Sequence, residues 1–71
     1  MVKYLIIFEK TASGFSAYVP DLPGCIATGK TKVGTEKNIL EAIRFHLGGM
    51  KEENIKFPLS TTDAETFVFA L

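Results

Sequence analysis

The sequence predicts an α+β domain of order β-β-β-α-β: an antiparallel three-stranded meander, one helix packed on one sheet face, and a fourth C-terminal strand. Two observations carry this prediction. Short segments with apolar side chains are separated by glycine-containing turns, and one longer segment has helical spacing. The expected strands are residues 2–9, 15–19, 25–30 and 66–71, and the expected helix lies within residues 31–50.

The first predicted strand carries two interleaved sets of apolar side chains. Because successive side chains of a strand point to opposite faces, this strand is apolar on both of them. We therefore expect it to lie centrally in the sheet. The two sets are Tyr4, Ile6 and Phe8 on one side, and Leu5 and Ile7 on the other.

Turn signals define the next two strands. Ser13-Gly14 ends the first hairpin, and the alternating Phe15, Ala17 and Val19 form its second strand. Pro20 closes that strand, and Pro23-Gly24 supplies the fixed φ and the positive φ that a type II turn needs. A third strand then spans about residues 25–30.

The helix is predicted from apolar residues three and four positions apart, flanked by Ile39 and His46. Its start is ambiguous, because Gly34 weakens a first turn that begins at Thr31, and Thr35 offers a later start. Gly48-Gly49 should loosen the last turns. The spaced residues are Leu40, Ile43, Leu47 and Met50.

The final strand is predicted at residues 66–71, where Phe67, Phe69 and Leu71 alternate with Val68 and Ala70. One helix covers only one face of a four-stranded sheet, yet the first and last strands are apolar on both faces. Much of the apolar set therefore lacks a cover within the chain, which predicts contact with a partner surface.

Size and charge limit the possible functions. The 71 residues form a single domain, 1–71, and eight basic residues balance eight acidic ones. Because zero net charge gives no field that attracts nucleic acid, direct nucleic-acid binding is not expected. No segment is long and apolar enough to be a membrane span or signal peptide, and the single Cys25 has no disulfide partner, so we expect a cytoplasmic protein.

The residues Tyr18-Val-Pro-Asp-Leu-Pro-Gly-Cys25, followed by Gly29-x-Thr31 and Glu41-Ala-Ile-x-x-His46, resemble the HicB family of antitoxins. The resemblance extends from the first strand to about Pro58. It implies a partial ribonuclease H-like domain that binds and blocks a messenger-RNA-cleaving toxin of the HicA type, with a threonine such as Thr31 capping the helix. Many such proteins continue into a DNA-binding domain. This sequence is expected to be a stand-alone short form without one.

The sequence gives little support for an enzymatic function. His46 is the only candidate base near neutral pH, and its place beside the apolar stripe favours a packing role. Cys25 follows the turn as a small packed residue. The first strand has no carboxylate in its apolar middle, where a metal-dependent nuclease of this fold usually places one. We therefore expect no catalytic, metal-binding or cofactor-binding residues.

The uncovered sheet face and the loop of residues 20–25 are the expected interface with a toxin, with Tyr18, Asp21 and Leu22 as the candidate contact residues. Two alternatives remain. The apolar face could instead be buried by further copies of the chain in a homo-oligomer, a dimer or tetramer, without a toxin. Phe15 and Tyr18 could also stack on RNA bases, although few cationic side chains surround them.

Overall fold

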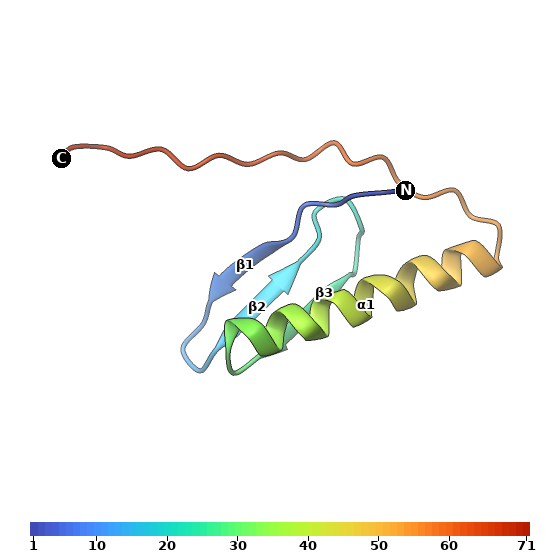
Figure 1. Cartoon of the computed structure of the whole chain (residues 1–71), viewed down its shortest axis with the longest axis horizontal. Coiled ribbons are helices and arrows are strands. Elements are labelled where there is room, and N and C mark those ends of the chain that lie inside the picture. The colour runs from blue at the N-terminus through green and yellow to red at the C-terminus, as the bar shows by residue number, and fades with distance from the viewer.

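The computed structural model describes residues 1–71 and shows a three-stranded antiparallel sheet with one helix on one face (Figure 1). Each strand pairs with its neighbour in sequence, so the sheet order is β1-β2-β3. The predicted α+β meander with a single covering helix is confirmed. The elements are β1 (Ile7–Lys10), β2 (Phe15–Tyr18), β3 (Ile26–Gly29) and α1 (Lys32–Glu52).

The core lies between the sheet and α1, nearer to β2 and β3 than to β1. Its buried centre combines one β2 residue, three residues of the loop that follows β2 and one helix residue. Above β1, the helix contributes the Lys32 ammonium, which lies 5.3 Å from the centre of the Phe8 ring. The buried apolar residues are Ala17, Val19, Leu22, Cys25 and Ile39.

The loop between β2 and β3 forms the type II turn that its sequence predicts. The Cys25 amide donates to the Leu22 carbonyl at 3.1 Å, and Gly24 has a φ of 82°. Pro23 and Gly24 thus occupy the two central positions, where a fixed negative φ and a positive φ are needed. The turn sends Leu22 and Cys25 into the core.

Helix α1 begins at Lys32, the earlier of the two possible starts. The Thr31 side chain accepts a hydrogen bond from the Gly34 amide at 3.0 Å and so caps the first turn. Gly29 permits the close approach of this turn, because a Cβ there would lie 2.6 Å from Thr35 Oγ1. The helix continues through Gly48-Gly49 to Glu52, so the two glycines do not end it.

The buried stripe of α1 is displaced from the predicted one. Thr35 and Ile39 are fully buried, whereas Leu40 is 37% exposed. Ile39, expected on the flank, is the centre of the stripe because α1 lies over β2 and β3, with Ala42, Ile43 and Leu47 packed around the core.

Two predictions about the sheet need correction. Only residues 7–10 of the first segment are paired, and β1 lies at an edge of the sheet because it pairs with β2 alone. The fourth strand expected at residues 66–71 is not formed. This segment is extended, but no backbone–backbone hydrogen bond involves residues 56–71.

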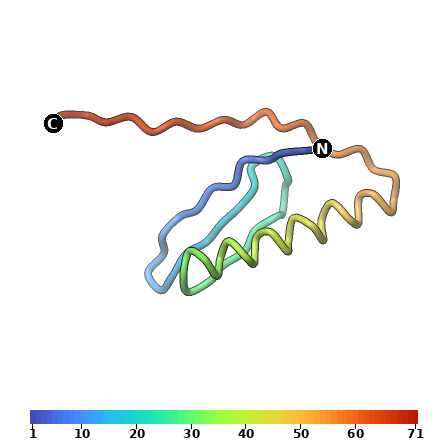
Figure 2. The backbone as a smooth tube through the Cα atoms, in the orientation of Figure 1, coloured from blue at the N-terminus to red at the C-terminus, as the bar shows by residue number.

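The extended segment gives the molecule an open shape. Its radius of gyration is 14.0 Å, against about 11 Å expected for a compact chain of this length. Figure 2 shows that the chain after α1 returns past the N-terminus and then continues away from the sheet. Residues 63–71 are all exposed. The compact part of the molecule is therefore the sheet, its loops and α1.

Replacing Ile39 by alanine tests the position of the core. Because Ile39 is fully buried, Ile39→Ala should lower the free energy of unfolding by about 2–4 kcal/mol. Chemical denaturation followed by circular dichroism measures this loss. Val33→Ala is the matched control on the same helix, since Val33 is 78% exposed, and it should change stability by less than about 0.5 kcal/mol. Equal losses for both variants would contradict the assigned core.

Candidate interaction site

The sheet face opposite α1 carries an apolar row that crosses all three strands. Ile7 is paired with Tyr18, and Tyr18 is paired with Ile26, so the three side chains stand side by side. Ile26 is 62% exposed, and Ile7 and Tyr18 are partly exposed. We call Ile7, Tyr18 and Ile26 the apolar row. Its exposure confirms that one helix leaves the second face without a complete cover.

The apolar row is bordered on one side by polar side chains and on the other side by the β2–β3 loop. The next aligned positions along the strands are Glu9, Ser16 and Thr28. At the opposite end, a shallow depression is lined by Tyr18, Ile26 and most of the loop between them, residues 19, 20 and 22–25. An apolar centre with a polar border is the usual composition of a protein–protein contact surface.

The three predicted contact residues occupy different environments. Tyr18 lies in the middle of the apolar row, between Ile7 and Ile26. Leu22 has no exposed surface and packs in the core beneath the loop. Asp21 is partly exposed, and its carboxylate binds residues from a distant part of the same chain.

The Asp21 carboxylate accepts four hydrogen bonds from two consecutive threonines. Oδ2 accepts from the Thr61 and Thr62 amides at 3.1 and 3.0 Å, and Oδ1 accepts from their hydroxyls at 3.2 and 2.9 Å. The backbone hydrogen bond from Thr62 is the main cause of a lowered Asp21 pKa, with the other bonds adding to it and partial desolvation opposing it.

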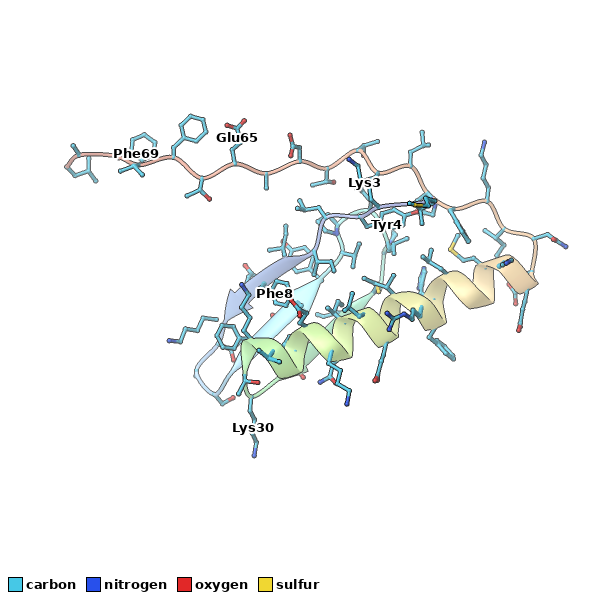
Figure 3. All side chains as sticks on the ribbon, viewed as in Figure 1. Lys3, Tyr4, Phe8, Lys30, Glu65 and Phe69 are labelled. Carbon is cyan, nitrogen blue, oxygen red and sulfur yellow. The ribbon has the colours of Figure 1, made fainter.

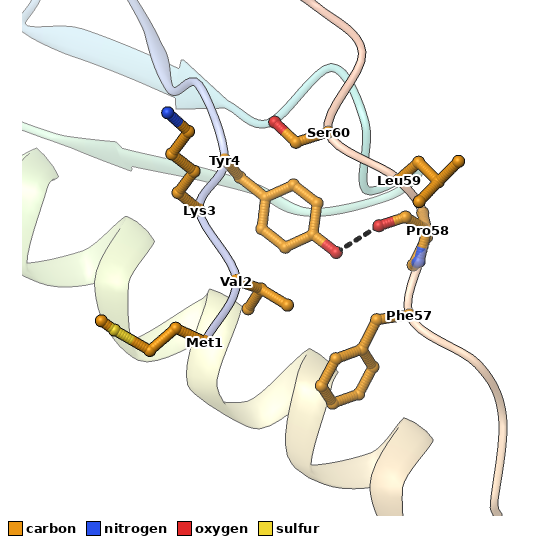
Figure 4. A pocket seen from close by; sticks show the side chains of 8 residues that line it. All are labelled: Met1, Val2, Lys3, Tyr4, Phe57, Pro58, Leu59 and Ser60. Carbon is orange, nitrogen blue, oxygen red and sulfur yellow. Dashed lines mark hydrogen bonds between the residues drawn. The ribbon is translucent and has the colours of Figure 1, made fainter.

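A second contact holds the same returning segment. The Tyr4 hydroxyl donates to the Pro58 carbonyl at 2.6 Å, and the N-terminal residues and residues 57–60 line a depression around it (Figure 4). We call the contacts of Tyr4 and Asp21 with residues 58–62 the clamp. The clamp fixes the chain after α1 to the residues that precede β1 and to the β2–β3 loop.

Sequence reasoning did not find the clamp. The partners of the Asp21 carboxylate lie 40 and 41 residues away in the chain, beyond the reach of local sequence patterns. Two adjacent threonines after a proline do offer several donors close together, yet nothing in their sequence indicates which carboxylate they meet. Figure 3 shows how Tyr4 lies near this returning segment, while Glu65 and Phe69 lie farther along it.

The two candidate catalytic groups, Cys25 and His46, lie on different elements, the β2–β3 loop and α1. Cys25 is buried in the core, and burial raises the pKa of its thiol, which disfavours the reactive thiolate. His46 is partly buried on α1, on the side of the helix that also carries Ala42 and Leu47. No group of three or more histidine, cysteine, aspartate or glutamate side chains is placed to hold a metal ion. The helix α1 lacks the apolar stretch that a membrane span requires.

A compact sheet with one covered face, an exposed apolar row and a loop fixed by the clamp is the type of surface that small protein-interaction domains present. Comparison with known proteins identifies its family. The family model described as HicB-like antitoxin of bacterial toxin–antitoxin systems matches residues 4–68. The chain belongs to this family of HicB-like antitoxins.

Two curated relatives differ in length. An uncharacterised 14.9 kDa protein of Haemophilus phage HP1 is 42% identical over 57 residues, which are 80% of this chain and 43% of that protein. A UPF0150 protein of Thermoplasma acidophilum is 39% identical over 66 residues, 92% of this chain and 96% of that protein. The chain thus spans less than half of the phage relative and nearly all of the archaeal one.

Two solved structures share the fold. A chain in a HicA3 and HicB3 toxin–antitoxin complex is 35% identical, with a TM-score of 0.68 over 84% of this chain and 70% of that chain. The crystal structure of the antitoxin HicB3 is also 35% identical, with a TM-score of 0.69 over 84% of this chain and 44% of that one.

Lowering the pH should release the clamp at Asp21. Its hydrogen bonds lower the carboxyl pKa, so the contact is fully present above the ordinary aspartate pKa of about 3.9 and is lost as the pH falls below it, through the depressed value. The amide proton shifts of Thr61 and Thr62, measured by NMR during an acid titration, should follow the Asp21 carboxyl. In the Asp21→Asn variant the Thr61 and Thr62 amide shifts should differ from those of the parent chain and should not change with pH. If the two amides of this variant titrated as they do in the parent chain, the contact with Asp21 would be contradicted.

Proposed function

We propose that this chain is an antitoxin module that binds a HicA-type toxin and neutralises its messenger-RNA cleavage by covering the toxin's active surface. The observation that carries the proposal is the exposed apolar row of Ile7, Tyr18 and Ile26 on the fold of a HicB-like antitoxin. A similar chain occurs in a HicA3 and HicB3 complex, which supports a partner of this kind. Because the toxin's target is messenger RNA, the complex would act in the cytoplasm.

The apolar row suits the centre of such an interface. Tyr18 is paired with an aliphatic residue on each neighbouring strand, and its hydroxyl provides a polar group at the end of an apolar body. Tyrosine residues in this position often contribute much of the binding energy, because neighbouring contacts exclude water from them. Glu9, Ser16 and Thr28 would then lie at the polar border of the contact.

Asp21 and Leu22 contribute to this interface by positioning the loop. Leu22 anchors the loop from within the core, and the clamp at Asp21 restrains it from outside. A loop held from both sides loses little conformational entropy when a partner binds. We therefore assign direct contact to Tyr18 and a positioning role to Asp21 and Leu22.

Catalysis forms no part of the proposal. The proposed function requires no catalytic group, and the Cys25 thiol is buried in the core. Neutralisation would instead depend on steric cover of the toxin, so its strength would follow the binding affinity.

The proposal is tested with a HicA-type toxin encoded beside this chain, co-purified with it and then measured by calorimetry. Ile26→Thr keeps a β-branched side chain in β3 but removes apolar surface from the row, and it should weaken toxin binding about 10-fold. The same variant should restore growth less well in cells that express the toxin.

Val33→Thr is the matched control. Val33 is also an exposed β-branched residue, but it lies on α1, away from the apolar row. It should leave the affinity unchanged within about 2-fold. Equal affinities for both variants, with each shown to be folded by circular dichroism, would contradict the assignment of the uncovered sheet face.

A further inference from the structure

Residues 64–71 form an arm that is apolar on both sides but contacts little of its own chain. Phe67 and Phe69 are 65% and 74% exposed, and their rings stack with centroids 6.5 Å apart on the same side of the extended backbone. Val68 on the opposite side is 96% exposed. A segment with alternating apolar side chains and unpaired backbone groups has the properties of a strand that lacks a sheet.

The clamp gives the arm a fixed origin. Thr61 and Thr62 are held by Asp21, and Pro58 is held by Tyr4, so residues before the arm are attached to the body. The arm then leads away from the sheet, as Figures 1 and 3 show. An eight-residue strand is about 26 Å long, which is enough to cover all of a four-residue strand and the residues before it.

The outer edge of β1 is free to receive such a strand. The Thr11 amide donates to the Gly14 carbonyl, so in this antiparallel ladder the pairs Glu9–Ser16 and Ile7–Tyr18 carry the hydrogen bonds. The backbone groups of Phe8 and Lys10 therefore point outward. No other backbone segment and no side chain of the chain bonds to them.

The outer edge of β3 is less suitable. The Val19 amide donates to the Cys25 carbonyl, so the backbone groups of Ile26 and Thr28 point away from β2. The Asn38 side chain already donates to the Thr28 carbonyl at 2.8 Å. Because α1 also packs mainly against this strand, β1 is the open edge of the sheet.

From these features we infer that two copies of the chain exchange arms, so that residues 64–71 of each copy pair with the outer edge of β1 in the other. The arm and residues 4–8, which lead into β1, both carry apolar side chains on both faces, so the arm matches the apolar part of this edge. The exchange is reciprocal, as a two-fold dimer requires, and zero net charge adds no overall repulsion between copies. The inference does not rest on the proposed toxin binding, because it is argued from the backbone edge of β1 and from the arm, whereas the toxin is assigned to the exposed face of the sheet.

The mass in solution tests the exchange. By light scattering after gel filtration, the chain should have twice its 7.8 kDa mass. Replacing both exposed rings, Phe67→Ser and Phe69→Ser, should raise the dimer dissociation constant at least about 100-fold. Phe45→Ser is the matched control, because Phe45 is 87% exposed on α1 and lies outside the arm and β1, and it should remain dimeric.

A mixed sample of labelled and unlabelled chains locates the contact. Isotope-filtered NMR should show contacts between the Phe67 or Phe69 rings of one copy and Ile6 or Phe8 of the other. A monomer at millimolar concentration, contacts found only within one copy, or a dimer unaffected by the two serine substitutions would each overturn the inference. Loss of toxin binding with the dimer intact would contradict only the proposed function.

Discussion

The structure depends on a coverage constraint: α1 is the only helix, and it can cover only one face of the sheet. It packs over β2 and β3, with Ile39 at the centre of the buried stripe. The opposite face consequently presents Ile7, Tyr18 and Ile26, and the β1 edge stays open. Both proposed interaction surfaces arise because the chain has more strand-forming apolar surface than this helix can bury.

A second constraint comes from the clamp. The hydrogen bonds of Asp21 with Thr61 and Thr62 join the β2–β3 loop to the chain that follows α1. They restrain the loop beside the apolar row and also set the point from which the arm departs. One carboxylate thereby links the proposed toxin surface, on the exposed face of the sheet, to the proposed surface for self-association at the outer edge of β1.

Sequence patterns predicted the elements that depend on local geometry. Pro23-Gly24 formed the expected type II turn, because fixed φ values leave few alternatives. The edge position of β1 could not be predicted in this way: an apolar pattern on both faces shows that a strand is to be covered, but not whether the cover belongs to its own chain. The unpaired segment 66–71 reflects the same ambiguity. For the site, the exposed position of Tyr18 follows from strand alternation, whereas the burial of Leu22 and the partners of Asp21 depend on tertiary contacts between distant residues.

The central claim is that the face left bare by α1 is where the toxin binds. Its most direct test is NMR of the isoleucine methyl groups with a soluble paramagnetic agent, recorded for the chain alone and in complex with a HicA-type toxin. The account predicts that the Ile26 methyl, which is accessible in the free chain, becomes strongly protected in the complex, while Ile39 in the core stays protected in both. An Ile26 methyl that is equally accessible before and after the toxin binds would contradict it.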